Sequence, residues 1–241
     1  MALMLIASPG QGSEGNAYKA PTLSQASMKR PMVRFFYRPV LRSPFVISCL
    51  PGVGGVGEQV ARYLSRALGS SLFAELISPS LPDYVIVEEG ICRLPKISFY
   101  AAEKTEPNLV IVLGDALPSH DDLAAYYELC EAVVELVKEF GAEAVVSVGG
   151  FLAPRRASKG VFVAFTSEEL GELFLRAGAH LMPPGRIVGP TGLISALAAE
   201  AGIKAACLLG EVAMPLEDKE AGREVLRVLM EALGLSSRPP S

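Results

Sequence analysis

The sequence predicts an α/β protein in which helices cover both faces of a central sheet. From residue 45 onward, short apolar runs alternate with longer segments whose apolar residues recur every three to four positions. The short runs are almost continuously apolar, which is typical of strands buried on both faces. We therefore expect a three-layer α/β/α sandwich with a mixed, mostly parallel sheet.

The expected elements follow in a regular order. A strand over 45–50 ends at Pro51-Gly52 and leads into a helix that Gly69 terminates. The stretch 71–101 has no helical period and is expected to contain strands and a hairpin at Glu89-Gly90. The expected strands are 45–50, 71–77, 84–88, 91–94, 97–101, 109–113, 144–148, 161–165 and 203–209. The expected helices are 56–68, 121–140, 166–177, 190–202 and 217–233.

The helix over 121–140 has the clearest apolar stripe. Ser119 and Asp122 resemble a capping box at its start, and Gly141 ends it. The stripe, which we expect to face the core, comprises Leu123, Tyr126, Tyr127, Cys130, Val133, Val134 and Val137.

Composition and charge divide the chain into three parts. Residues 1–44 have a net charge of +5 and, up to residue 30, no apolar periodicity, so we expect a flexible basic N-terminal extension. Residues 45–235 should form a single α/β domain, followed by a short tail at 236–241. The chain beyond residue 44 has a net charge of −9, which argues against nucleic acid as the main partner.

The composition also excludes several other classes. No apolar run is long enough for a membrane span, and no basic segment precedes the apolar start, so we expect a cytoplasmic protein without a signal peptide. The cysteines at 49, 92, 130 and 207 are scattered and are expected to be buried, reduced thiols. With only His120 and His180 available, we expect no metal site.

The sharpest local pattern is a G-x-G-x-x-G sequence at 52–57, between an expected strand and an expected helix. Its glycines, Gly52, Gly54 and Gly57, could let the backbone approach a pyrophosphate, and Glu75 could bind a ribose. However, Glu75 lies inside an apolar run, and a hairpin rather than a helix follows. We interpret the loop as a structural turn without a cofactor, and nucleotide binding remains the alternative.

Two carboxylates at strand ends, Asp115 and Glu211, are the other candidates for chemistry. Enzymes with α/β folds place acids and bases at such positions. No nucleophile, histidine and acid can be combined with them from this sequence, and Ser195 lacks the flanking glycines of a nucleophile elbow. We expect Asp115 and Glu211 to act as caps or loop anchors. The alternative is an enzyme that uses them with the 52–57 loop.

Five glycine-containing motifs, at 52–57, 113–118, 148–150, 187–194 and 208–212, occur in an order that resembles the proteasome assembly chaperone family. The resemblance extends over about 45–235 and is to archaeal homologues of the second eukaryotic chaperone subunit. The matching positions are Gly52, Gly55, Gly57, Gly114, Asp115, Pro118, Gly149, Gly150, Gly189, Gly192, Gly210 and Glu211.

The resemblance implies a phosphorylase/hydrolase-like sandwich that forms a homo-oligomer and binds other proteins without catalysis. The implied partners are proteasome α subunits, their assembly intermediates or a chaperone paralogue. Members of this family that engage the proteasome directly tend to end in a hydrophobic-Tyr-any tripeptide. This chain instead ends in Arg238-Pro239-Pro240-Ser241, so we expect its folded body or its basic arm to make the contact.

Overall fold

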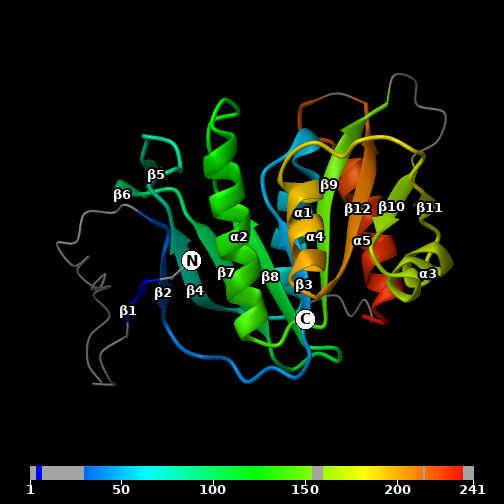
Figure 1. Ribbon diagram of the computed structural model, residues 1–241, viewed down its shortest axis with the longest axis horizontal. Coiled ribbons are helices and arrows are strands. Elements are labelled where there is room, and N and C mark those ends of the chain that lie inside the picture. Colours follow the sequence, from blue (N-terminus) through cyan, green and yellow to red (C-terminus); the bar gives the residue numbers. More distant parts are fainter. Residues whose placement is uncertain (1–3, 7–29, 154–159, 214, 236–241) are drawn as a thin grey trace.

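The computed structural model describes residues 4–6, 30–153, 160–213 and 215–235 (Figure 1). A ten-stranded sheet has the order β1-β2-β4-β7-β8-β3-β9-β12-β10-β11, and β5-β6 forms a separate hairpin. The strands are β1 (Met4–Ile6), β2 (Met32–Phe35), β3 (Phe45–Cys49), β4 (Ser71–Ile77), β5 (Ile86–Glu88), β6 (Ile91–Arg93), β7 (Ile97–Ala102), β8 (Leu109–Gly114), β9 (Ala144–Leu152), β10 (Val161–Phe165), β11 (His180–Leu181) and β12 (Lys204–Val212). The helices are α1 (Val56–Ala67), α2 (Leu123–Glu139), α3 (Glu168–Arg176), α4 (Pro190–Glu200) and α5 (Lys219–Ala232), and a 3-10 turn, η1 (Val53–Gly55), precedes α1.

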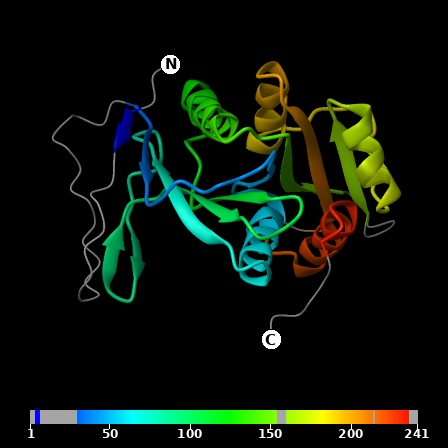
Figure 2. The same cartoon turned by 90° about the horizontal axis from the view of Figure 1, so that it is seen from below.

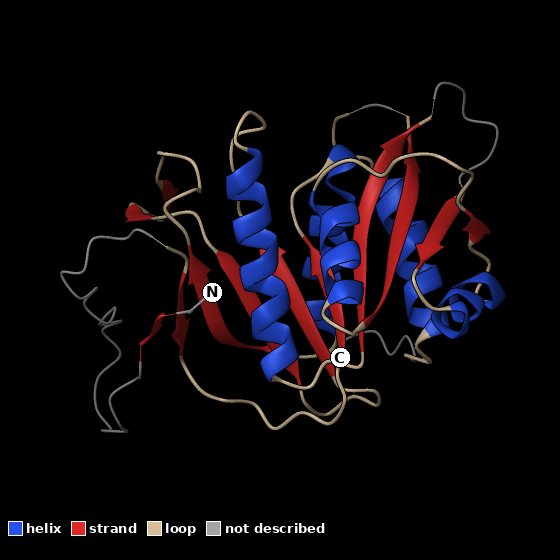
Figure 3. Cartoon of the chain, viewed as in Figure 1, coloured by secondary structure: helices blue, strands red, loops and turns tan. Residues whose placement is uncertain are grey.

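The centre of the sheet is parallel, because β8, β3, β9 and β12 run side by side in one direction. Antiparallel pairs of β7 with β8 and of β10 with β12 flank this centre. Figure 3 shows the strands as one layer with α2 and α4 in front of it. The predicted mixed, mostly parallel sheet is confirmed.

Two helical layers enclose the sheet. Successive residues of a buried strand face opposite sides, so each side of the sheet packs against its own set of helices. Ile47 and Val146 pack in one core cluster with residues of α1, α3 and α5. Val46 and Val145 pack in the other cluster with residues of α2 and α4. Figure 2 shows α2 and α4 on one side of the strands and α1 and α5 on the other. The predicted three-layer architecture is confirmed.

The helices follow the apolar spacing of the sequence. In α1, the buried residues Val56, Val60, Ala61 and Leu64 fall on one face. The helix ends before Gly69, whose φ of 58° lies in the left-handed region that a glycine adopts without strain. The buried face of α1 packs on β3 and β9, and this packing fixes the position of the 52–57 loop that leads into α1.

The sheet extends further toward the N-terminus than the sequence predicted. β2 lies within the segment assigned to the flexible extension, yet it pairs antiparallel with β4 and buries Met32, Val33 and Phe35. Arg34, which lies between Val33 and Phe35 on β2, forms an ion pair with Glu75 on β4, with 2.5 Å between Nη2 and Oε2. The prediction that 1–44 is an extension is therefore wrong for β2, which is part of the domain. Residues 1–3 and 7–29 and the tail at 236–241 lie outside the described residues.

The hairpin β5-β6 forms where the sequence predicted one, but it stands apart from the main sheet. Its separation exposes Cys92, so the prediction that every cysteine is buried is wrong at this position. Cys49, Cys130 and Cys207 are buried free thiols, as predicted. Among the described residues, no helix is both long and apolar enough to cross a membrane.

Candidate functional site

The glycine loop at 52–57 lies at the carboxyl edge of the sheet, the edge where the parallel strands β3, β8, β9 and β12 end. Several of its backbone groups form hydrogen bonds within the protein. Gly54 N donates to Pro215 O at 3.2 Å, and Gly55 N donates to Gly52 O at 3.2 Å. Gln59 Nε2 donates to the carbonyl oxygens of Gly54 and Gly55 at 3.1 and 3.2 Å. The conformation of the loop is therefore fixed by hydrogen bonds within it and to Gln59 and Pro215.

Close packing explains why glycines occupy this edge. A Cβ atom on Gly150 would lie 2.5 Å from Val53 O, and one on Gly54 would lie 2.8 Å from Val212 Cγ2. A Cβ on Gly57 would lie 3.0 Å from Val148 O, so this glycine lets α1 approach β9. The geometry favours the interpretation of the loop as a structural turn.

Glu75 lies away from the glycine loop. β7 and β8 separate β4 from β3 in the sheet. The three strand spacings between β4 and β3 amount to roughly 14 Å. The carboxylate of Glu75 is fully buried and binds both Arg34 and Lys96. The structure thus does not bring Glu75 and the 52–57 loop together in one site.

Asp115 anchors the hairpin β5-β6 to the end of β8. Its Oδ2 lies 2.5 Å from Arg93 Nη1 and accepts a hydrogen bond from Lys96 N at 3.1 Å. Arg93 also binds Glu88 at 2.9 Å, and its hydrogen bond and charge lower the pKa of the Glu88 carboxyl. The arrangement gives Asp115 a structural role of the kind that the sequence predicted.

Glu211 is buried at the end of β12, where its Oε2 accepts a hydrogen bond from Gly160 N at 3.2 Å. Four further motif glycines, Gly114, Gly149, Gly192 and Gly210, lie at close contacts. A Cβ on Gly192 would lie 2.6 Å from Ile187 O, one on Gly149 2.8 Å from Thr191 Oγ1, and one on Gly210 2.9 Å from Val225 Cγ2. A Cβ on Gly114 would lie 2.9 Å from Leu50 Cδ2. Gly189 has a different reason to be glycine, since its φ is 94° at the start of α4. Pro118 is buried between β8 and α2.

The hydroxyl of Ser195 and the thiol of Cys207 are engaged in hydrogen bonds with each other and with the backbone. Ser195 Oγ, on α4, donates to Ala206 O at 3.1 Å and accepts from Cys207 Sγ at 3.2 Å. Burial raises the pKa of the Cys207 thiol, and it raises that of Cys130 to about 12. No three His, Cys, Asp or Glu side chains in the described part of the chain are placed to hold a metal ion.

A groove in the surface around α4 is lined mostly by apolar residues. This α2–α4 groove has a volume of about 630 Å³ and is lined by the start of α2, by α4, by residues 185–189 that lead into α4, and by the end of β10. Leu123, Tyr127 and Val188 stand at its rim with exposed fractions of 70%, 51% and 89%. The groove is thus surrounded by large apolar side chains in contact with water.

The sequence analysis missed this groove because it assigned Leu123 and Tyr127 to the buried stripe of α2. That assignment is wrong, since the buried face of α2 centres on Leu129, Cys130 and Val133. The apolar spacing carried no signal of this, since Leu123 and Tyr127 share one stripe with Cys130 and Val134, which are buried.

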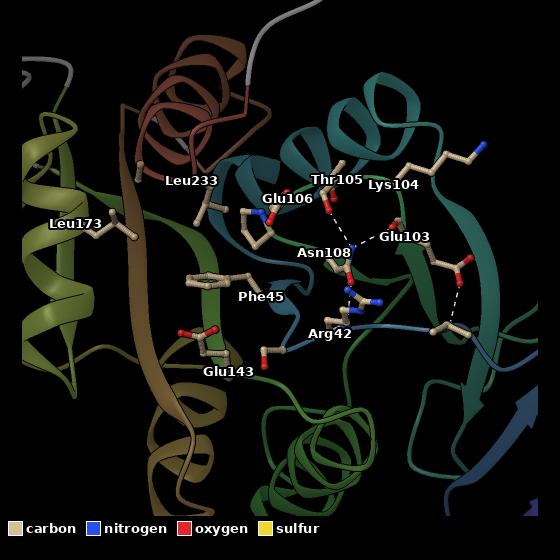
Figure 4. Close-up of a pocket in the computed structure, with 14 residues that line it drawn as sticks. Arg42, Phe45, Glu103, Lys104, Thr105, Glu106, Asn108, Glu143, Leu173 and Leu233 are labelled. Atoms are coloured by element: carbon tan, nitrogen blue, oxygen red, sulfur yellow. Dashed lines mark hydrogen bonds between the residues drawn. The ribbon is translucent and has the colours of Figure 1, made fainter.

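A second cavity, of about 850 Å³, opens at the opposite edge of the sheet and was not predicted. This amino-edge cavity is bordered by the 40–45 segment, the 103–108 turn and the end of α5 (Figure 4). Asn108 organises it: Oδ1 accepts from Arg42 N at 2.8 Å, and Nδ2 donates to the carbonyl oxygens of Glu103 and Thr105 at 3.0 and 2.8 Å.

Comparisons with known proteins find the same overall fold in solved structures. Residues 46–239 match the model of the PAC2 family. An uncharacterized protein of Methanocaldococcus jannaschii is 32% identical over 195 residues, covering 77% of this chain and 72% of that protein. Pyrococcus furiosus PbaB, an archaeal proteasome activator, is similar with a TM-score of 0.82 and 28% identity, covering 88% of this chain and 92% of PbaB. Pyrococcus furiosus PbaA, an archaeal homolog of proteasome-assembly chaperone, gives a TM-score of 0.72 and 27% identity over 86% of this chain and 83% of PbaA.

Proposed function

Since this chain belongs to the PAC2 family, we propose that it is a non-catalytic protein that binds proteasome α subunits or their assembly intermediates, and that it does so as a homo-oligomer. The similarity to PbaA, a homolog of proteasome-assembly chaperone, supports this class of partner.

The α2–α4 groove is the observation that carries the proposal. Single exposed apolar residues are common on any protein surface, but a group around one groove is typical of a protein-binding site. Tyr127 supplies an aromatic side chain of the kind enriched at interface centres, and Leu123 and Val188 add exposed apolar area beside it. The groove therefore suits an apolar protein segment.

A catalytic role finds less support because the carboxylates that it would use are engaged in structural contacts. Asp115 binds Arg93, and Glu211 binds the amide of Gly160. The alternative of nucleotide binding at 52–57 is tested by titrating NAD, NADP and ATP and measuring the melting temperature. We expect no shift, and a saturable shift at micromolar nucleotide would favour the alternative.

Binding is tested directly with purified archaeal proteasome α subunits and the tagged full-length chain. We expect Leu123→Glu to weaken binding at least about tenfold, which corresponds to roughly 1.4 kcal/mol. The matched control is Tyr63→Glu, an exposed position on α1 at the opposite face of the sheet, which should bind like the wild type. Equal binding by the wild type, Leu123→Glu and Tyr63→Glu would show that the groove is not part of the interface.

A second candidate function is activation of the assembled proteasome, which the TM-score of 0.82 to the activator PbaB favours. The two candidates differ in the state of the partner. Stimulated peptide hydrolysis by preassembled proteasomes would identify an activator. Binding to unassembled α subunits without stimulation would identify an assembly factor.

Homo-oligomerisation is tested separately, by sedimentation velocity over micromolar concentrations. An obligate oligomer buries upwards of about 2,000 Å² per interface and should not dissociate in this range. A monomer throughout the range would contradict this part of the proposal and leave the α-subunit test unaffected.

A further inference from the structure

The hairpin β5-β6 carries a concentration of exposed apolar side chains. The exposed fractions lie between 41% and 72% for Tyr84, Val85, Val87, Ile91 and Leu94. No other part of the described chain exposes as many large apolar residues within so short a stretch. The hairpin is also separate from the ten-stranded sheet, and Figure 2 shows it (teal, lower left) projecting away from the other strands. The hairpin is therefore placed to contact another molecule.

The outer edge of β5 lacks the features that usually keep a strand edge unpaired. Within the described residues, β5 pairs only with β6, in an unbroken register that sets Val87 opposite Cys92. Exposed edges are commonly blocked by lysine, proline or a bulge, and β5 contains none of these. Its one charged residue, Glu88, is already paired with Arg93. Residues 85–87 are all β-branched, which favours an extended strand, whereas β6 includes Arg93 itself.

The turn of the hairpin determines which backbone groups face outward. Glu89 and Gly90 have φ values of 51° and 81°, as in a type I′ turn, so Glu88 and Ile91 form the hydrogen-bonded pair that closes it. Hydrogen-bonded and non-hydrogen-bonded pairs alternate along antiparallel strands. Val87 therefore directs its N–H and C=O away from β6, where another strand can bind them.

A second copy of the same strand fits this edge. A two-fold axis at Val87 would place Val87 opposite Val87 of the second copy, and Ile86 opposite its Glu88, in an antiparallel pair. No two like charges would then lie directly opposite each other, an arrangement that would destabilise the pair. We propose that two copies of this chain associate through β5, so that their hairpins form one four-stranded sheet. The inference rests on the proposed homo-oligomer and names one of its interfaces.

Cysteine cross-linking tests the register of this pair. Val87→Cys, in a chain that also carries Cys92→Ser, should form a disulfide-linked dimer under a mild oxidant. The Cα atoms of a hydrogen-bonded antiparallel pair lie about 5.5 Å apart, a separation that a disulfide spans. The matched control is Val85→Cys in the same background, whose two thiols would lie roughly 14 Å apart along the strands and should not join. Absence of the Val87→Cys disulfide on a non-reducing gel would overturn the proposal.

The natural Cys92 supplies a second distance. It is the only exposed cysteine among the four of the chain. In the four-stranded sheet, the two Cys92 residues would be separated by three strand spacings, roughly 14 Å. A bis-maleimide with a spacer of this length should therefore link the wild-type chains, whereas oxidation alone should not. A disulfide between two Cys92 residues would overturn the proposal, because the edges of β6 would then be paired.

Proline substitution tests the backbone pairing. Val87→Pro removes an N–H that points outward and leaves the hydrogen bonds of the hairpin intact, so the variant should sediment as a smaller species than the wild type. The matched control is Cys92→Pro, at the opposite edge of the same hairpin, which should sediment like the wild type. Circular dichroism establishes that both variants are folded, and if Val87→Pro is not, the disulfide test decides.

The outcomes separate this inference from the proposed function. If the wild type is an oligomer and both proline variants sediment alike, the pairing through β5 is overturned and the homo-oligomer stands. If the wild type is a monomer, both are contradicted. Binding to proteasome α subunits is measured independently of either result.

Discussion

The carboxyl edge of the sheet and the α2–α4 groove differ in how clearly the sequence marks them. At the edge, glycines in recognisable motifs pack so closely that a Cβ on Gly150 would lie 2.5 Å from Val53 O. At the groove, no motif marks the surface, and its rim consists of ordinary apolar residues such as Leu123. The difference teaches that a conspicuous sequence pattern can report a packing constraint, while a binding surface can arise from apolar residues that packing leaves over.

The comparison is tested most strongly by Gly150→Ala. If the edge is a packing site, the added methyl group overpacks β9 against η1 and lowers the free energy of unfolding by about 3 kcal/mol. Gly52→Ala is the matched control, because Gly52 has an extended φ of −169° and the new Cβ would lie 4.0 Å from Leu50 O. That control should change stability by less than about 0.5 kcal/mol. Urea denaturation measures both, and equal effects would contradict the packing explanation.

Arg93→Gln should have the next largest effect, since it removes the partner of both Asp115 and Glu88. We expect a loss of about 1–2 kcal/mol, against less than about 0.5 kcal/mol for the exposed control Arg62→Gln. The Glu88 carboxyl has its pKa lowered from 4.5, chiefly by the hydrogen bond from Arg93. Its part of the stabilisation is therefore present above pH 4.5 and is lost as the pH falls through the lowered pKa.

That pH dependence is measured by comparing the unfolding of wild type and Arg93→Gln between pH 7 and pH 3. The difference in stability should be constant above the ordinary Glu pKa of 4.5 and should shrink below it. A difference that grows toward acid would show that Arg93 acts through something other than these carboxylates.

Removal of residues 236–241 should have a smaller effect on partner binding. If the groove and not the tail makes the contact, affinity for α subunits should change by less than about threefold, well below the 1.4 kcal/mol of a tenfold change. Surface plasmon resonance with both chain lengths measures this. Loss of binding on truncation would move the interface from the groove to the tail.

The smallest expected effect is that of Leu123→Ser on stability. Because this side chain is 70% exposed, its replacement should change the free energy of unfolding by less than about 0.5 kcal/mol. A larger loss, measured by thermal and urea unfolding, would mean that Leu123 belongs to the core after all.

The fold was predictable to the extent that its signals are local. The continuous apolar runs of β3, β8, β9 and β12 predicted the buried parallel centre, and the spacing in α1 and α5 predicted amphipathic helices. β2 escaped prediction because Arg34 interrupts its apolar residues, and its charge is satisfied by Glu75, 41 positions away. Such a long-range pairing leaves no trace in a local pattern.

The candidate sites were less predictable than the fold. Asp115 and Glu211 were correctly placed at strand ends, but their partners Arg93 and Gly160 come from other parts of the chain. Which apolar residues of α2 remain exposed depends on where α4 packs beside it. The amino-edge cavity likewise depends on how three separate segments meet, so neither opening could be read from spacing alone.

The ion pair between Arg34 and Glu75 has a consequence for how β2 finds its place. The two residues lie directly opposite each other in the antiparallel pair of β2 with β4. A slip by one residue would turn Arg34 to the opposite face of the sheet and leave the buried carboxylate of Glu75 without that partner. Buried ion pairs add little net stability, but they strongly penalise wrong arrangements. The pair therefore fixes the register of β2, because it allows only one alignment of this strand beside β4.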